Sequence, residues 1–181
     1  MNISRTEISD VILIKPNVFS DDRGYFFESF RENILTDYLG YKVNFCQNNE
    51  SKSSYGVLRG LHYQAPPFSQ TKLVRVIQGR VLDVAVDIRS DSPTFGMHVA
   101  VELNDANKKQ LLIPKGFAHG FVTLSNTAIL SYKVDNYFNR EFEKGIAFDD
   151  LSLNINWKIQ NLKISKKDMN QPLFIDLPKL F

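Results

Sequence analysis

Short runs of β-branched and aromatic residues, separated by turn residues, recur along most of the chain. They follow one another at roughly the 8 to 12-residue spacing that is typical of a β-sandwich or a barrel. The runs are Val11–Ile14, Tyr25–Phe30, Val43–Cys46, Tyr55–Tyr63, Lys72–Ile77, Arg80–Ile88, Val99–Leu103, Lys109–Ile113, Gly120–Leu124 and Ile129–Val134. The pattern predicts an all-β core.

Three local signals refine this prediction. Gln78-Gly79 separates two of the runs and predicts a hairpin between them. The segment Arg31–Leu39 has apolar residues at helical spacing and predicts one short helix. Ser165-Lys166-Lys167-Asp168 has the form of a helix start, but Pro172 follows too soon for a long helix. We expect the tail after Trp157 to form loops and short turns packed against the barrel.

Length and charge exclude several classes of protein. The chain has 181 residues, of which 43% are hydrophobic, so residues 1–181 are expected to form one domain. With 22 basic and 20 acidic residues there is no basic tail for a nucleic acid. Cys46 is the only cysteine, and the N-terminal residues lack the apolar core of a leader, which predicts a cytoplasmic protein. No apolar stretch approaches the ~20 residues that a membrane span requires.

His62 is one of only three histidines and lies in Leu58-Arg59-Gly60-Leu61-His62-Tyr63. Strand alternation predicts Leu58, Gly60 and His62 on one face and Arg59, Leu61 and Tyr63 on the other. If the first face lines the interior, Gly60 leaves room for a ligand beside the imidazole. A core histidine satisfied by a hydrogen bond is the alternative, and spacing alone leaves both open.

His119 lies in Pro114-Lys115-Gly116-Phe117-Ala118-His119, a pattern that resembles the second motif of the cupin barrels. In metal-binding cupins this histidine is a ligand together with a His-x-His pair, which this chain lacks. A transition metal usually requires several such ligands, so we expect no metal site.

Proton transfer is the chemistry that these residue types support best. One inward histidine can remove a carbon-bound proton near neutral pH, and an ammonium group can stabilise the resulting enolate. Lys72 alternates with Val74 and Val76, so it is expected to point inward unless it protects an edge strand. Tyr132 shares a face with Leu130 and Val134 and is either structural or a proton donor. Arg23 and Arg59 suit phosphate recognition, although solvated surface arginines are the alternative.

As an ordered series, the motifs from about Lys15 to Asp168 resemble the dTDP-4-dehydrorhamnose 3,5-epimerase family. The series consists of Phe19-Ser20-Asp21-Asp22-Arg23-Gly24-Tyr25-Phe26-Phe27-Glu28, Gln47-Asn48-Asn49, Gly56-Val57-Leu58-Arg59-Gly60-Leu61-His62-Tyr63-Gln64, Pro67-Phe68-Ser69-Gln70-Thr71-Lys72-Leu73-Val74, Asp87-Ile88-Arg89, Ser92-Pro93-Thr94-Phe95-Gly96, Pro114-Lys115-Gly116-Phe117-Ala118-His119-Gly120-Phe121 and Tyr132-Lys133.

The resemblance implies a cupin-like jelly-roll barrel without metal or cofactor, a homodimer, and a nucleoside-diphosphate 4-keto-6-deoxy sugar as substrate. It implies that His62 is the base, Asp168 orients it, Lys72 stabilises the enolate and Tyr132 is the acid. The positions that correspond to substrate contacts in the family are Arg23, Phe26, Glu28, Gln47, Asn49, Arg59, His119, Glu143 and Lys167.

The last third departs from the family pattern. Tyr137-Phe138 stands where two tyrosines are common, and Ala147-Phe148-Asp149-Asp150 stands where Arg-Trp-Asp-Asp is usual. The substrate is therefore expected to be either a dTDP-hexose or a GDP-heptose, for deoxysugar and surface polysaccharide synthesis. A C3-only or C5-only epimerase, a sugar-nucleotide ketoisomerase and a non-catalytic carbohydrate-binding cupin are the alternatives.

Overall fold

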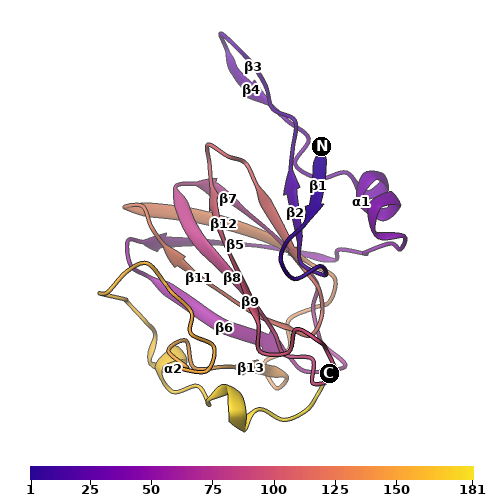
Figure 1. The fold of residues 1–181 in the computed structure, drawn as a ribbon. Coiled ribbons are helices and arrows are strands. Elements are labelled where there is room, and N and C mark those ends of the chain that lie inside the picture. The colour runs from indigo at the N-terminus through magenta and orange to yellow at the C-terminus, as the bar shows by residue number, and fades with distance from the viewer.

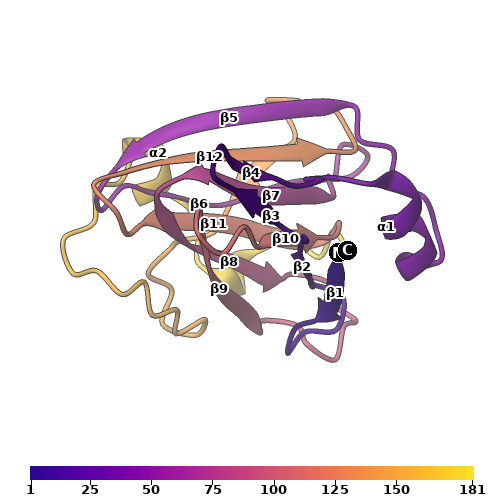
Figure 2. The same ribbon diagram turned by 90° about the horizontal axis from the view of Figure 1, so that it is seen from above.

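Two stacked antiparallel β-sheets form the body of the protein in a computed structural model that describes residues 1–181 (Figure 1). The six-stranded sheet consists, in order, of β1 (Asn2–Arg5), β2 (Ile12–Lys15), β10 (Gln110–Ile113), β7 (Lys72–Gln78), β12 (Thr127–Val134) and β5 (Gln47–Ser54). The five-stranded sheet consists of β13 (Glu143–Gly145), β6 (Leu58–Gln64), β11 (Phe117–Thr123), β8 (Arg80–Asp87) and β9 (His98–Asn104). Figure 2 shows β5 and β12 in one layer and β8 and β9 in the other. The predicted all-β jelly roll is confirmed, although its sheets do not close into a barrel.

Two elements lie outside these layers. The hairpin of β3 (Phe19–Asp21) and β4 (Gly24–Phe26) projects from the body as an arm (Figure 1). Helix α1 (Glu32–Leu39) follows it and confirms the predicted helix; it ends at Gly40, whose φ of 78° suits a glycine C-cap. No helix is long and apolar enough to cross a membrane.

The predicted hairpin at Gln78-Gly79 is wrong. Strands β7 and β8 flank Gly79 but belong to different sheets, so the chain turns a corner there. Gly79 has a φ of 81°, and a Cβ at this position would collide with the Thr127 carbonyl oxygen. Only glycine fits such a corner. In the sequence, a glycine between two apolar runs looks the same at a corner as it does in a two-residue hairpin turn.

The strand predicted at Val43–Cys46 is also wrong, because the regular strand β5 begins at Gln47. Strand β5 has the all-polar sequence QNNESKSS and lies at the sheet edge, where β12 is its only partner. A polar edge strand has no hydrophobic run to reveal it, and polar or charged edges resist aggregation. The unpredicted strands β1 and β13 are edge strands as well.

Two large hydrophobic layers hold the fold together, and a smaller cluster around Leu35 packs α1 on the six-stranded sheet. The first lies between the sheets and includes Val74, Val76, Leu111 and Leu130. The second lies between the five-stranded sheet and the C-terminal tail, which contains α2 (Lys166–Met169) and the 3-10 turn η1 (Phe174–Asp176) (Figure 1). Trp157 is buried in this layer, and the predicted packing of the tail is confirmed.

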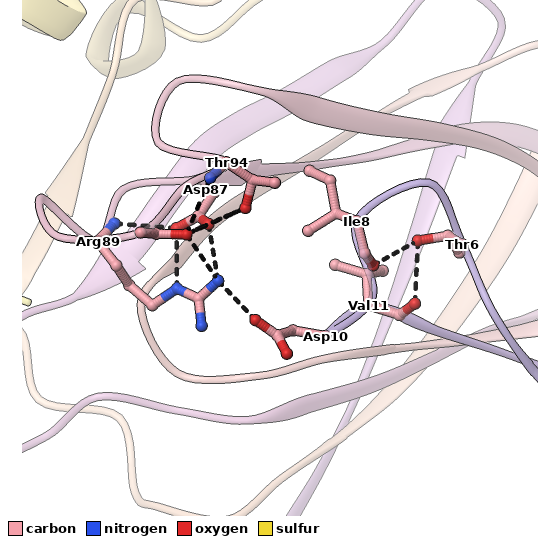
Figure 3. A network of polar contacts seen from close by, with 8 residues as sticks. Thr6, Ile8, Asp10, Val11, Asp87, Arg89 and Thr94 are labelled. Atoms are coloured by element: carbon pink, nitrogen blue, oxygen red, sulfur yellow. Dashed lines mark hydrogen bonds and ion pairs between the residues drawn. The ribbon is translucent and has the colours of Figure 1, made fainter.

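A network of hydrogen bonds fixes the end of β8. The fully buried carboxylate of Asp87 accepts bonds from Arg89, Ser92 and Thr94, at 2.6–3.0 Å (Figure 3). Arg89 also pairs with Asp10 at 2.7 Å. Burial raises the pKa of Asp87, but these hydrogen bonds outweigh burial and leave the pKa below its usual value. The network ties the N-terminal segment to the loop after β8.

Candidate active site

A cavity of about 610 Å³ lies between the sheets and is lined by strands of both. Its volume is within the range of small-molecule sites. Eight of the predicted site residues line it: Arg59, His62, Lys72, His119, Tyr132, Glu143, Lys167 and Asp168. The chain brings them together from β6, β7, β11, β12, β13 and α2.

A bulge in β6 turns His62 toward this cavity. His62 pairs with His119 of β11, and Arg59 pairs with Phe121, so Gly60 and Leu61 together face Gly120. This extra residue shifts the alternation by one. Leu58 and Leu61 therefore pack in the tail-covered hydrophobic layer, whereas Arg59 and His62 line the cavity. The predicted division of the two faces is therefore wrong for Leu58 and Arg59, whereas Leu61 and Tyr63 lie opposite His62 as predicted.

His62 forms a hydrogen-bonded pair with Asp168 of α2. The distance from His62 Nε2 to Asp168 Oδ1 is 2.7 Å, and the Asp168 side chain is almost completely buried. Burial raises the pKa of Asp168, but the hydrogen bond and charge of His62 and the Gly60 backbone N–H outweigh it, so the pKa is lowered. An ionised carboxylate only accepts, so His62 donates from Nε2 and keeps Nδ1 free to take a proton.

Lys72 lies in the interior of the six-stranded sheet, because β7 is flanked by β10 and β12. The edge-strand interpretation is therefore wrong. Its side chain points inward and is 9% exposed, and its Nζ donates to the His62 carbonyl oxygen at 3.3 Å. Burial lowers the pKa of Lys72 to about 8, while the negative charges of Asp83 and Glu143 oppose the shift.

Tyr132 enters the cavity from β12. Burial raises the pKa of its phenol, against the opposing effects of a hydrogen bond with Asn49 and the charge of Arg59. Asn49 in turn accepts a hydrogen bond from Gln47 at 2.7 Å. Gln47 and Asn49 thus contact the site through Tyr132 rather than by lining the cavity. A phenol that stays protonated can donate a proton to a carbanion.

His119 forms a second histidine–carboxylate pair in the cavity wall. Its Nε2 lies 3.0 Å and 2.9 Å from the two carboxylate oxygens of Asp83. Asp83 was not predicted from the sequence, because it lies within the apolar run of β8 and belongs to no recognised motif. The only signal in the sequence is that Asp83 is an acidic residue among apolar residues that face the core.

Charged side chains surround the rest of the cavity. Lys167 Nζ lies 2.6 Å from Glu143 Oε2, and the Nε of Arg59 donates to Ser53 Oγ at 3.1 Å. Several other polar residues that line the cavity were not predicted from the sequence, namely Glu50, Ser51, Gln64, Gln70 and Ser165. Gln64 and Gln70 lie within the family motifs, which was the available signal.

Three predicted site residues do not reach this cavity within the protomer. Arg23 and Phe26 are on the projecting arm, where the Arg23 side chain is 90% exposed and Phe26 is 67% exposed. Glu28 follows the arm and pairs with Arg31 at 3.5 Å. Within one chain they therefore lie apart from His62, and their contact with substrate stays a prediction.

No cluster of three or more His, Cys, Asp or Glu side chains suited to holding a metal ion occurs in the structure. His62 and His119 each use one ring nitrogen on an aspartate.

Comparison with known proteins identifies the family. The sequence profile described as dTDP-4-dehydrorhamnose 3,5-epimerase matches residues 5–176. The chain belongs to this family. A dTDP-4-dehydrorhamnose 3,5-epimerase of Shigella flexneri is 52% identical, with 97% of each chain covered. As a member of the epimerase family, the chain is an isomerase, which excludes the non-catalytic alternative.

Solved structures of epimerases have the same fold. The enzyme of Elizabethkingia anophelis has a TM-score of 0.94 at 48% identity, covering 100% of this chain and 99% of that one. The enzyme of Legionella pneumophila, in complex with dTDP-4-keto-L-rhamnose, has a TM-score of 0.95 at 45% identity, covering 98% of this chain and 94% of that one.

Proposed function

We propose that the protein catalyses the 3,5-epimerisation of a dTDP-linked 4-keto-6-deoxyhexose. The observation that carries this proposal is the convergence of the His62–Asp168 pair, Lys72 and Tyr132 on one cavity in a member of this family. The dTDP-sugar in the Legionella pneumophila structure supports the choice of nucleotide. The GDP-heptose alternative and the role in surface polysaccharide synthesis stay predictions.

The reaction begins with proton removal next to the ketone. The C4 carbonyl acidifies the hydrogens on C3 and C5, and His62 Nδ1 takes one of them. The electron pair of the broken C–H bond forms a C=C bond, and negative charge develops on the C4 oxygen. The ammonium group of Lys72 stabilises this enolate, because its charge is held on a side chain that is itself buried from water.

Inversion follows when the same carbon is protonated on its opposite face. Tyr132 is suited to this step because it enters from the six-stranded sheet, whereas His62 enters from the five-stranded sheet. The phenol O–H bond breaks, a C–H bond forms and the C4 ketone returns. Exchange with water then removes the proton from His62 and restores the one on Tyr132. The same cycle at the other carbon completes the reaction.

We infer further that the protein acts as a homodimer in which the arm of one chain reaches the partner's cavity. This inference is supported by the exposed aromatic side chains of the arm, since large exposed apolar groups mark interaction surfaces. Arg23 would then meet the diphosphate, to which a guanidinium binds bidentately. Phe26 and Glu28 would reach the substrate by the same route.

Exchange in deuterium oxide tests the proposed reaction. Incubation with the dTDP-linked 4-keto-6-deoxyhexose should introduce deuterium at C3 and C5, and His62→Ala should abolish the exchange. His98→Ala is the matched control, since His98 lies on edge strand β9 and outside the cavity. Absence of exchange in the wild-type protein would contradict the proposal.

Product analysis by NMR separates the remaining alternatives. An inverted ring carbon indicates an epimerase, whereas a relocated carbonyl would indicate a ketoisomerase. Inversion at one carbon only would indicate a C3-only or C5-only enzyme. Turnover of a GDP-linked 4-keto heptose in preference to the dTDP-hexose would overturn the proposed nucleotide.

A further inference from the structure

Asp83 is a fully buried carboxylate behind His119 of the cavity wall, and the proposed mechanism does not use it. It lies on β8 between Val81 and Ala85, and both of these pack into the hydrophobic layer between the sheets. Its hydrogen-bond partner is the Nε2 of His119. Burying an ionised carboxylate among apolar side chains costs free energy unless a positive charge or several hydrogen-bond donors offset the loss of water.

Asp87, four residues further along the same strand, shows how this fold satisfies a carboxylate that serves structure. It is also fully buried, but it accepts hydrogen bonds from a guanidinium, two hydroxyls and a backbone N–H (Figure 3). Asp83 has neither an arginine nor a hydroxyl as a partner. The two aspartates therefore differ in what their surroundings supply.

Lys72 is a buried positive charge on which the charge of Asp83 acts. Its ammonium group is buried, and its hydrogen bond goes to the neutral carbonyl of His62. The charge of Asp83 acts on it from β8 more strongly than the charge of Glu143 acts from β13. Other titratable groups line the cavity from the strands and the tail around it. They are Glu50 on β5, Arg59, His62 and Tyr63 on β6, His119 on β11, Tyr132 on β12, Lys163 of the tail, and Lys167 and Asp168 on α2.

We propose that Asp83 is a positioning residue of this active site, which holds His119 by Nε2 and keeps the ammonium of Lys72 charged where the enolate forms. The proposal rests on the proposed function for its enolate. Its structural content, the pairing of Asp83 with His119 and its electrostatic effect on Lys72, does not depend on which substrate is bound.

The position of His119 supports this assignment. His119 and His62 are register partners on adjacent strands, and each uses Nε2 to bind an aspartate. In both residues the carboxylate fixes the donor nitrogen and leaves Nδ1 as the free ring nitrogen. The Asp168 pair thus orients the base, and the Asp83 pair orients a second imidazole of the same cavity wall.

The test compares Asp83→Asn with the matched control Asp87→Asn. Asn keeps the size of the side chain and removes its charge. The ammonium of Lys72 is titrated by NMR through its Cε and Nζ resonances, without substrate. Since Asp83 favours the charged form of Lys72, its removal should shift the Lys72 titration to lower pH by about one unit. The alkaline limb of kcat against pH should move in the same direction.

The control should destabilise the protein and leave the Lys72 titration where it is in the wild type. An unchanged Lys72 titration in folded Asp83→Asn would overturn the proposal, even if activity falls. Should Asp83→Asn not fold, Asp83→Ser is titrated in its place. In addition, the ¹⁵N spectrum of the wild-type protein should show His119 protonated at Nε2, and a neutral Nδ1–H tautomer would overturn the proposal.

The two proposals fail in different ways. If the wild-type protein does not epimerise the dTDP-sugar, the proposed function fails, but the lysine titration still decides whether Asp83 acts on Lys72. If epimerisation occurs and the Lys72 titration does not respond to Asp83, only the positioning role fails.

Discussion

Lys72 shows at the scale of one residue how a catalytic group works against stability. Its ammonium group is buried, and burial lowers its pKa to about 8 from the model-compound value of 10.5. Below pH 8 the Lys72 ammonium is charged in both states, but the charged form is solvated better in the unfolded chain. It therefore lowers the free energy of unfolding. Between pH 8 and 10.5 the unfolded chain binds more protons, so the contribution of Lys72 to stability becomes less unfavourable as pH rises.

Lys72→Met is accordingly expected to stabilise the protein at pH 7 while it abolishes epimerisation. The gain in the free energy of unfolding should be about 1–3 kcal/mol, since one pKa unit corresponds to about 1.4 kcal/mol. Denaturant unfolding at pH 7 and pH 10 measures it, and the gain should shrink at the higher pH. A variant that is less stable at pH 7 would show that the attraction of Asp83 and Glu143 to the ammonium group contributes more free energy than its burial costs.

In the proposed mechanism, Lys72 also sets the alkaline limit of activity. The ammonium form is the active one in the proposed mechanism, so kcat should fall as pH rises through about 8. Lys72→Arg keeps a charge to much higher pH and should lose that limb even if its rate is reduced. The pH dependence of kcat measures this, and a limb that persists in Lys72→Arg would assign it to another group.

Tyr132→Phe should separate the two halves of the reaction. Proton removal by His62 does not need the phenol, whereas protonation on the opposite face does. We expect deuterium exchange to continue while net inversion falls by about 10²-fold or more, within the range for a general acid. NMR follows both in one sample, and equal loss of exchange and inversion would contradict the assignment.

At the scale of an element, a helix of four residues holds the carboxylate that pairs with His62. Helix α2 begins at Lys166, and the Oγ of its N-cap Ser165 accepts a hydrogen bond from the Asp168 backbone N–H at 3.1 Å. So short a helix has little stability of its own, and the N-cap hydrogen bond is one of the few interactions that stabilise it. The position of Asp168 therefore depends on Ser165.

Ser165→Ala should lower kcat by about five-fold, which corresponds to the ~1 kcal/mol of a lost N-cap. Ser165→Thr keeps the capping oxygen and should retain most of the activity. Kinetics and thermal unfolding of both variants measure the effect. If the two variants have the same kcat, the cap does not position Asp168.

The elements that sequence predicted correctly are those with a hydrophobic pattern. The inward faces of β7 around Lys72 and of β12 around Tyr132 follow from Val74, Val76 and Leu130, which pack between the sheets as expected. Strand β5 could not be predicted from such a pattern, because its residues are polar and only one edge is paired. The corner at Gly79 was missed because a turn sequence does not say which sheet the next strand joins.

The site was predictable where short motifs carry it and not where the tertiary fold creates it. His62, Lys72, Tyr132 and Asp168 were named from sequence, and the fold brings them into one cavity. Asp83 could not be predicted from the sequence, because its partner His119 lies on the neighbouring strand β11 and the two meet only in the folded sheet. The bulge at Gly60 likewise depends on how β6 pairs with β11.

At the scale of the whole molecule, the arm distributes one site over two chains in the proposed dimer. Arg23→Ala alone and His62→Ala alone should each be inactive or strongly impaired. When the two variants are mixed and exchange subunits, the chain with intact His62 receives an intact arm from its partner. Activity should return to about a quarter of wild type, because half of the dimers are mixed and each has one complete site.

Subunit mixing followed by the epimerisation assay measures this recovery. Arg5→Ala replaces Arg23→Ala in the matched control, because Arg5 lies on β1, outside the arm and the cavity. Mixed Arg23→Ala and His62→Ala subunits that stay inactive after exchange would place the arm on its own chain's cavity or exclude it from the reaction.

The proposed acid and base belong to different sheets, with Tyr132 on one and His62 on the other. No hydrogen-bond ladder spans the gap between these strands, so their separation is set by the thickness of the side chains packed in between. Leu130 and Phe121 line the cavity and also belong to that packing. A larger or smaller side chain at these positions would change the distance between His62 and Tyr132. The rate of turnover can therefore be altered through the core packing while every reacting group is kept.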